Sequence, residues 1–200
     1  MGNSRDYKLV TLIGGLVGLL IQPIIANLVV SPSIILRLGT LFGFLILAPL
    51  ALWTAAFLGK FVPVLYQFAK FAAVGALNTM IDFGVFNLEV LFSGISKGVA
   101  ASGFKAVSFL FATTNSFFWN KYWTFGVKEK ATSGEAAKFY LVAFLGWSVN
   151  VSIFSFVVNI MGAPHGVSDA LWANFGVLCG VAGAFLIDFL GFKYIVFKKA

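Results

Sequence analysis

The chain has 200 residues, of which 60% are hydrophobic and only 10% are charged. Soluble globular domains are about 45–50% apolar and about 25% charged, so this composition excludes a soluble domain. The apolar runs are long enough for membrane-spanning helices, and the short alternating strands of a membrane barrel are not seen. Because backbone polar groups must be paired inside a bilayer, the sequence predicts an all-α integral membrane protein built as a helix bundle.

Six apolar segments are each about as long as the 20 residues that cross the hydrocarbon core as a helix. They lie near residues 9–30, 38–58, 70–92, 104–126, 138–161 and 171–196. Turn-forming stretches separate them, such as SPS at 31–33 and SGISKG at 93–98. The first segment is longer than the apolar core of a signal peptide, so we expect it to be retained as a transmembrane helix. The sequence therefore predicts six transmembrane helices.

The positive charges divide unequally between the two sides of such a bundle. Most of the 14 Lys and Arg residues fall on the side that holds both termini. These are Arg5, Lys8, Lys60, Lys70, Lys121, Lys128, Lys130, Lys138, Lys193, Lys198 and Lys199. Cytoplasmic loops carry an excess of Lys and Arg, so we expect a multi-pass protein of the inner or plasma membrane with both termini in the cytoplasm. The net charge of +7 is then a topology signal and does not indicate nucleic-acid binding.

Short sequences recur at nearly constant spacing along the chain. AKFAAV at 69–74 is followed by AKFYLV at 137–142, and KYWTF at 121–125 by KYIVF at 193–197. These spacings of 68 and 72 residues indicate that the third and fourth spans form a helical hairpin that the fifth and sixth spans repeat. With two spans in each copy, both copies would face the same way, as a parallel repeat about an axis along the membrane normal.

The predicted domain organisation follows from this repeat. Residues 1–62 have no counterpart elsewhere in the chain, so we expect them to form an added two-helix hairpin. Residues 63–200 would form a four-helix domain, whose repeats cover about 66–126 and 134–198. Transporters built from repeats bind their substrates at the repeat interface, which is where we expect the site.

The repeated segments also carry a resemblance to a known family. The pattern F-x-x-V-G-x-x-N at 71–78 begins the first hairpin, NKYWTF at 120–125 ends it, and AAKFYLV at 136–142 begins the second. Over about residues 66–198 the chain resembles the GtrA-like family. The resemblance implies four transmembrane helices in this region. It also implies a role in moving a polyprenyl-phosphate-linked monosaccharide, or the bare carrier lipid, across the membrane.

Two lysines are candidates for binding the lipid phosphate. Lys121 and Lys193 close the fourth and sixth spans at equivalent places in the two copies. A lysine ammonium is a compact charge suited to phosphate, so we expect the two to flank one phosphate group. The neighbouring Asn120 is a candidate for contact with the sugar. The alternative is that both lysines extend to the membrane surface and only fix the topology.

Polar residues inside the spans are candidates for lining a route for the sugar. Asp82 lies about mid-membrane in the third span, and Asn78 lies one helical turn before it. A carboxylate at that depth costs several kcal/mol unless it faces a polar interior. Asp188 is a second such acid, and Asn150 matches Asp82 by the repeat offset. We expect a polar cavity between the hairpins; the alternative is a set of hydrogen bonds that only holds the helices together.

Three further residues are candidates for the same cavity. Glu89 shares the helical face of Asp82 but lies near the outer surface, and Asn115 suits either packing or cavity lining. Trp123, with Trp119 and its neighbours, is typical of an aromatic belt at the membrane surface. The alternative is that its ring stacks on a face of the sugar. The small residues of GVLCGVAGA at 176–184 indicate close helix packing in the last span.

The sequence shows no catalytic arrangement, since it lacks a glycine-rich phosphate loop, a cluster of metal ligands and a nucleophile beside a base. We therefore expect no enzyme activity, cofactor or metal. A separate glycosyltransferase would load the sugar onto the lipid. The function predicted first is a flippase-like transporter for a polyprenyl-phosphate sugar or its carrier. One alternative is a membrane scaffold for that glycosyltransferase, which the added hairpin favours. The other is a small-solute or ion transporter, and a homo-oligomer is compatible with each.

Overall fold

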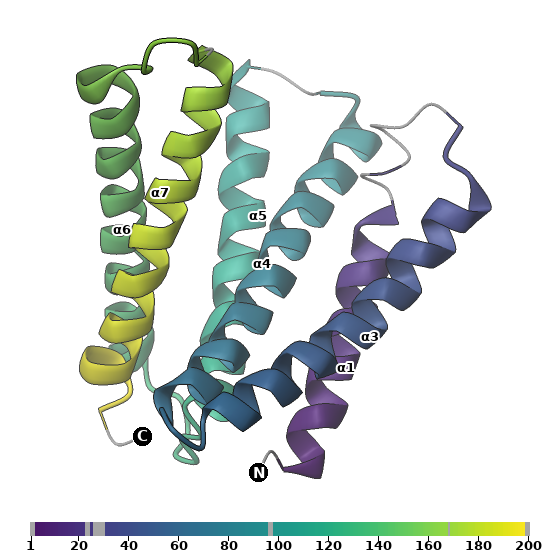
Figure 1. The fold of residues 1–200 in the computed structure, drawn as a ribbon, viewed down its shortest axis with the longest axis vertical. Helices are drawn as coiled ribbons and strands as arrows, with labels where there is room; N and C mark the ends of the chain where they lie inside the picture. Colours follow the sequence, from purple (N-terminus) through teal and green to yellow (C-terminus); the bar gives the residue numbers. More distant parts are fainter. Residues whose placement is uncertain (1–2, 23–24, 26–30, 96–97, 168, 199–200) are drawn as a thin grey trace. The chain divides into compact units, whose positions relative to one another are not determined.

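The computed structural model describes residues 3–22, 25, 31–95, 98–167 and 169–198 (Figure 1). Within these ranges, every regular element is a helix, which confirms the predicted all-α class. The chain forms two compact units, Met1–Gly126 and Val127–Ala200. The boundary between them falls between the two predicted repeats. The division into an added hairpin and a four-helix domain stays a prediction.

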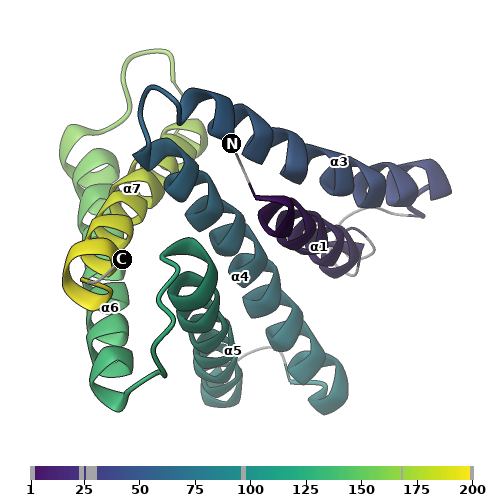
Figure 2. The ribbon, with the colours of Figure 1, turned by 90° about the horizontal axis from the view of Figure 1, so that it is seen from below.

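The described part of the first unit consists of four α-helices and a final π-helical turn. They are α1 (Ser4–Leu20), α3 (Ile34–Leu58), α4 (Val64–Ser93), α5 (Gly98–Trp119) and the turn η1 (Asn120–Thr124). Figure 2 shows α4 with α1 and α3 on one side and α5 on the other. The core contains α1 side chains such as Val10 and Ile13, together with Leu52, Val74 and Leu77.

Two glycines one turn apart allow α1 and α3 to approach closely. A Cβ atom on Gly14 would collide with the carbonyl oxygen of Phe44, and one on Gly18 would lie 3.0 Å from the Cα of Leu41. Small residues at this spacing let helix backbones meet, which is a common way to join helices inside a membrane. The helices α1 and α3 therefore form a tight antiparallel pair (Figure 1).

Side-chain caps fix where several helices begin. Asn3 caps α1, Ser33 caps α3, and Thr132 forms a reciprocal capping box with Glu135 at the start of α6. Each cap satisfies backbone N–H groups that have no partner inside the helix. The capping box explains why the polar stretch after the first unit ends where a long apolar helix starts.

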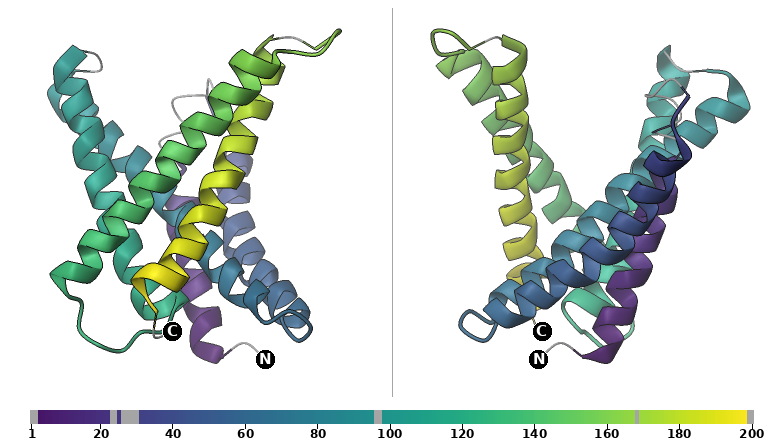
Figure 3. Two further views of the ribbon diagram at one scale, coloured as in Figure 1. Left: turned by 90° about the vertical axis from the view of Figure 1, so that its left-hand side faces the viewer. Right: turned by 45° about the vertical axis from the view of Figure 1, so that its right-hand side comes forward.

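The described part of the second unit is a helical hairpin with π-helical turns at the ends of both helices. It consists of α6 (Ser133–Ser155), η2 (Phe156–Met161), α7 (Asp169–Gly191) and η3 (Phe192–Val196). The left panel of Figure 3 shows α6 and α7 side by side and antiparallel. A Cβ atom on Gly180 would lie 2.7 Å from the main-chain oxygen of Asn150. The close packing predicted for residues 176–184 is therefore confirmed.

The two hairpins end in the same backbone arrangement. The N–H of Phe125 donates to the carbonyl of Asn120, and the N–H of Phe197 donates to the carbonyl of Phe192, both at 2.8 Å. Each bond joins residues five apart, and the two bonds are 72 positions apart in the sequence, as the KYWTF and KYIVF segments are. This shared π-helical turn supports the predicted repeat.

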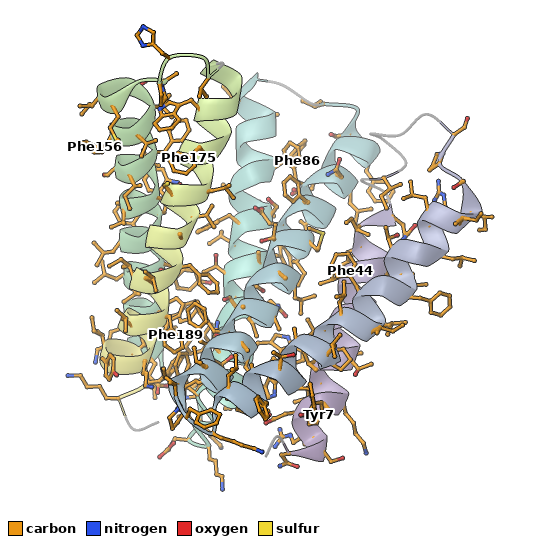
Figure 4. The ribbon with its side chains drawn as sticks, in the orientation of Figure 1. Tyr7, Phe44, Phe86, Phe156, Phe175 and Phe189 are labelled. Atoms are coloured by element: carbon orange, nitrogen blue, oxygen red, sulfur yellow. The ribbon has the colours of Figure 1, made fainter. Side chains whose placement is uncertain are left out.

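Four of the described helical segments are long and apolar enough to cross a membrane. They are Ile34–Leu58, Val64–Glu89, Ser133–Met161 and Leu178–Val196. Large side chains such as Phe156 project outward from these helices, as a lipid-facing surface requires (Figure 4). The chain is thus a multi-pass membrane protein. Six spans are not confirmed: α1 has 17 residues, and the rest of the first predicted span includes residues 23–24 and 26–30, outside the described residues.

Candidate functional site

Lys121 and Asn120 are buried in the turn that ends the first hairpin. Both residues are 0% exposed, and the Lys121 ammonium lies 5.8 Å from the centroid of the Tyr122 ring. The Asn120 amide donates to the hydroxyl of Ser116 at 3.1 Å. Its Oδ1 atom is buried and has no hydrogen-bond partner among the described residues. Because Lys121 is fully buried, its ammonium does not extend to the protein surface; the role of the two lysines stays a prediction.

Lys193 occupies the matching position in η3 and is half-buried. Its ammonium lies 5.7 Å from the ring centroids of Phe189 and Tyr194, within the range of cation–π attraction. Lys193 therefore keeps a cation at the end of the second hairpin, partly open to a ligand. Lys121 and Lys193 belong to different units, and their contact with one phosphate stays a prediction.

A polar cluster, formed by Asp6, Tyr66, Lys70 and Trp123, joins the start of α1 to α4 and η1. The Asp6 carboxylate accepts hydrogen bonds from the Trp123 indole and the Tyr66 hydroxyl, both at 2.9 Å. It also lies 3.8 Å from the Lys70 ammonium, which donates to the main-chain oxygen of Trp123 at 2.8 Å. The cluster therefore places the start of α1 at the same end of the unit as the turn η1.

Trp123 was expected in an aromatic belt at the membrane surface, and this prediction is wrong. The indole is 5% exposed and lies in the core of the first unit, because Asp6 provides a buried acceptor for its N–H group. A buried indole N–H needs such a partner. Tyr122 and Tyr194, by contrast, are exposed, as a belt requires.

A cavity of about 210 Å³ adjoins the polar cluster. It is lined by Arg5, Leu9, Phe118, Trp119, Tyr122 and Trp123. The cavity thus combines aromatic walls with one guanidinium group, next to the donors that meet Asp6. A group with an anionic part and an apolar or sugar part suits such a lining.

Polar side chains predicted to line a route for the sugar meet between α4 and α5. The Asn115 amide donates to Oδ1 of Asn78 at 2.7 Å, and the Ser108 hydroxyl donates to Oδ1 of Asp82 at 2.6 Å. These bonds fit the alternative in which the polar residues hold the helices together. The two bonds lie one helical turn apart on α4. The cavity predicted between the two hairpins stays a prediction.

The two polar residues predicted in the second unit each lie against a glycine of the opposite helix. Asn150 lies against Gly180, and the Asp188 carboxylate lies against Gly146. Oδ1 of Asp188 is buried and has no hydrogen-bond partner within the described ranges. The glycines therefore make room for polar groups between α6 and α7.

Glu89 lies near the end of α4 that is far from Lys70. It lines a separate cavity of about 390 Å³, together with Val85, Leu88, Phe92, Ser93 and Phe104. One of its carboxylate oxygens is buried and unpartnered among the described residues. In the part of the chain that the structure describes, no group of three His, Cys, Asp or Glu side chains is placed to hold a metal ion.

The bond between Asn78 and Asn115 gives a direct test of the α4–α5 contact. We expect Asn78→Ala and Asn115→Ala each to destabilise the protein, because each leaves the other amide unpaired. A double-mutant cycle of unfolding free energies should give a coupling of about 0.6 kcal/mol, and at most about 1.7 kcal/mol. Additivity of the two changes within about 0.3 kcal/mol would show that the two amides do not interact.

Comparison with known proteins places this arrangement in a family. The profile of the GtrA/DPMS transmembrane domain matches residues 70–197, which include both lysine-bearing π-turns. The "uncharacterized membrane protein YngA" of Bacillus subtilis (strain 168) is 28% identical over 142 residues, which are 70% of this chain and 86% of that protein. The "bactoprenol-linked glucose translocase" of Shigella phage SfII is 27% identical over 137 residues, which are 68% of this chain and 99% of that protein.

No solved structure matches the chain significantly. The matched region covers well over half of the chain and contains α5, α6 and α7 together with most of α4. The helices α1 and α3 lie outside it. From this match, the chain belongs to the GtrA/DPMS transmembrane-domain family.

Proposed function

We propose that the chain moves a polyprenyl-phosphate-linked monosaccharide, or its polyprenyl-phosphate carrier, across the membrane. The observation that carries the proposal is the pair of matching π-helical turns, each of which ends a hairpin and contains a lysine. π-helical turns are rare and are often found at functional sites. Membership of the family and similarity to a bactoprenol-linked glucose translocase favour the same class of substrate.

The lysines of the two turns would bind the phosphate of the lipid. Lys193 is half-buried and partly accessible to a phosphate, whereas the fully buried Lys121 becomes accessible only when neighbouring side chains move. That movement is expected of a transporter that opens to one side of the membrane at a time. The unpartnered Oδ1 of Asn120 is an acceptor for a sugar hydroxyl beside the phosphate.

Polar residues inside each hairpin would lower the cost of carrying a sugar past the hydrocarbon. In the first hairpin these are Asn78, Asp82 and Asn115, and in the second they are Asn150 and Asp188. A sugar hydroxyl both donates and accepts, so it can replace the present hydrogen bonds one at a time. The apolar tail of the lipid stays in the bilayer throughout. The proposal gives the chain no bond-making step, which falls to a separate glycosyltransferase.

A second candidate function is recruitment of that glycosyltransferase by a membrane scaffold. The observation that favours it is the tight pair of α1 and α3, which lies outside the region matching the family and carries none of the predicted sugar-binding residues. A scaffold would need this pair for contact with its partner. It would not need the lysines of the π-turns.

Transport by reconstituted liposomes tests the proposal. The substrate would be radiolabelled neryl-phosphate glucose, whose short tail allows uptake into the liposome to be followed. We expect uptake by the wild type and at least a tenfold loss in the double variant Lys121→Ala/Lys193→Ala, because the phosphate loses both cations. The matched control is Lys128→Ala/Lys130→Ala, which removes two charges from exposed positions. Uptake by the first double variant at the wild-type rate would refute the proposed phosphate site. No uptake by a well-folded wild type, across several sugars and with an imposed proton gradient, would favour the scaffold.

A further inference from the structure

The carboxylate of Asp6 lies where donors from three other side chains meet. The indole of Trp123 and the hydroxyl of Tyr66 each donate to it at 2.9 Å, and the ammonium of Lys70 lies 3.8 Å away. The side chains of Lys70 and Asp6 are only 12% and 15% exposed. An anion at this point is therefore recognised by two neutral donors and a cation, with little water around it. That is also the chemistry by which proteins recognise a phosphate.

The cation at this point is held without the help of Asp6. Lys70 donates to the main-chain oxygen of Trp123 at 2.8 Å, a bond an ångström shorter than its distance to the carboxylate. Its ammonium also lies 5.5 Å from the ring centroids of Tyr66 and Trp123. Removal of the carboxylate would therefore leave a positioned cation and two free donors, which favour another anion.

The donors and the anion come from different parts of the chain. Lys70 and Trp123 lie inside the region that matches the family, and Tyr66 lies four residues before it. Asp6 belongs to the first turn of α1, which lies outside that region. The aromatic cavity of about 210 Å³ adjoins the cluster and has Arg5 and Trp123 in its lining. It gives space for the group that a bound phosphate carries.

We propose that Tyr66, Lys70 and Trp123 form a phosphate-binding site, which Asp6 of the same chain fills in this structure. Trp123 lies on the same π-helical turn as the buried Lys121, so the site would bind the lipid phosphate before it reaches Lys121. Its assignment to a lipid phosphate rests on the proposed function. The carboxylate acts as an internal competitor that a ligand must displace.

Displacement requires only a local change in α1. Asp6 lies in the first turn, where its N–H donates to the carbonyl of the cap residue Asn3 at 2.8 Å. The rest of the helix is anchored by the buried Val10, Ile13 and Val17 and need not move. Unwinding of one turn would thus open the site while the tight pair of α1 and α3 stays intact.

Calorimetric titration of the full chain in detergent micelles with geranyl phosphate tests the site. We expect Asp6→Ala and the isosteric Asp6→Asn to tighten binding at least tenfold, because each removes the competing charge. Adding Lys70→Met to either variant should abolish the gain. Glu129→Ala is the matched control, since it removes an exposed acid elsewhere, and geraniol is the control without phosphate. A titration with inorganic phosphate distinguishes a site for a lipid phosphate from a site for free phosphate. If the Asp6 variants bind inorganic phosphate more tightly by the same factor, the site is supported and is assigned to free phosphate.

Unchanged affinity in an Asp6 variant that keeps its helical content and unfolding temperature would overturn the proposal. A gain that survives Lys70→Met, or that Glu129→Ala reproduces, would do the same. The wild type offers a test that needs no variant: saturating geranyl phosphate should speed hydrogen exchange in the first turn of α1, and unchanged exchange would also overturn the proposal. If the wild type transports the sugar in the liposome assay but the Asp6 variants show no tighter binding of geranyl phosphate, the role of Asp6 as an internal competitor is refuted. The proposed function would then still stand.

Discussion

Gly180→Ala is expected to lower the free energy of unfolding by about 1–3 kcal/mol, although alanine favours a helix over glycine by about 1 kcal/mol. The new Cβ atom would lie 2.7 Å from the main-chain oxygen of Asn150 and 3.0 Å from its Oδ1. A side chain can rotate away from such a contact, but main chain cannot. The two helices of the second hairpin must therefore move apart, and they lose packing on both sides of Gly180.

The measurement is thermal or SDS-induced unfolding in detergent micelles, followed by circular dichroism. The matched control is Gly43→Ala in α3, where a Cβ atom would meet nothing within 4 Å. Since the new Cβ atom collides with nothing at Gly43, only the higher helix propensity of alanine remains, and it should raise the free energy of unfolding by up to about 1 kcal/mol. Opposite signs for the two variants are the expected result. Equal changes would mean that Gly180 does not set the distance between α6 and α7.

Asp82→Asn is expected to reduce uptake of the lipid-linked sugar at least tenfold while the protein keeps its fold. Asparagine retains an Oδ1 acceptor for the hydroxyl of Ser108, so the 2.6 Å bond between α4 and α5 persists. What the substitution removes is the charge of a carboxylate at mid-membrane depth. A group so costly to bury is expected to serve function, because a neutral amide would hold the helices equally well.

Ser108→Ala is the matched control for this prediction, because it removes the hydrogen bond between the two side chains and keeps the carboxylate. We expect it to lower stability by about 1 kcal/mol with a smaller effect on uptake. The same pair of variants separates the two candidate functions. Uptake at the wild-type rate by Asp82→Asn would show that the carboxylate is not needed for transport. Loss of uptake with unchanged capture of the glycosyltransferase would argue against a mere scaffold.

The helices could be predicted from the sequence because apolar length and turn residues mark them locally. The close approach of α6 and α7 was also predictable, since small residues at 176–184 permit it whatever the exact rotation of the helices. The number of spans also depends on residues outside the described ranges, which include 23–24 and 26–30 of the first predicted span.

The polar cluster at Asp6 could not be predicted from periodicity or motif. Its bonds join residues 60 and 117 positions apart in the sequence, and such contacts depend on how helices dock. One signal was available: Asp6 is the only acid in the first 81 residues. An isolated acid at the start of an apolar helix needs a partner, but its charge also suits the helix N-terminus, so the sequence does not indicate a distant partner. The burial of Trp123 could not be predicted either, because it depends on the hydrogen bond between its indole and Asp6.

The partners of the predicted polar residues also depended on the docking of helices. Asn78 and Asp82 were expected to share a face, and both do meet polar groups. Asn115 and Ser108 are these groups because of how α5 is rotated about its own axis against α4, which the sequence does not indicate. The π-helical turns were equally hidden, because KYWTF and KYIVF contain no residue that forbids an ordinary α-helix. Their recurrence in sequence was visible, but their geometry was not.

Each π-helical turn has a consequence for how the chain tolerates insertions and deletions. A turn closed by a bond between residues five apart holds one residue more than an α-helical turn. Since an α-helix rotates by about 100° per residue, deletion of one residue within η1 would redirect the helix end by that angle. The change would carry Trp123 away from Asp6 even if every side chain were kept. Length is therefore constrained at these two points as strictly as amino-acid identity, and natural variation there should take the form of substitutions.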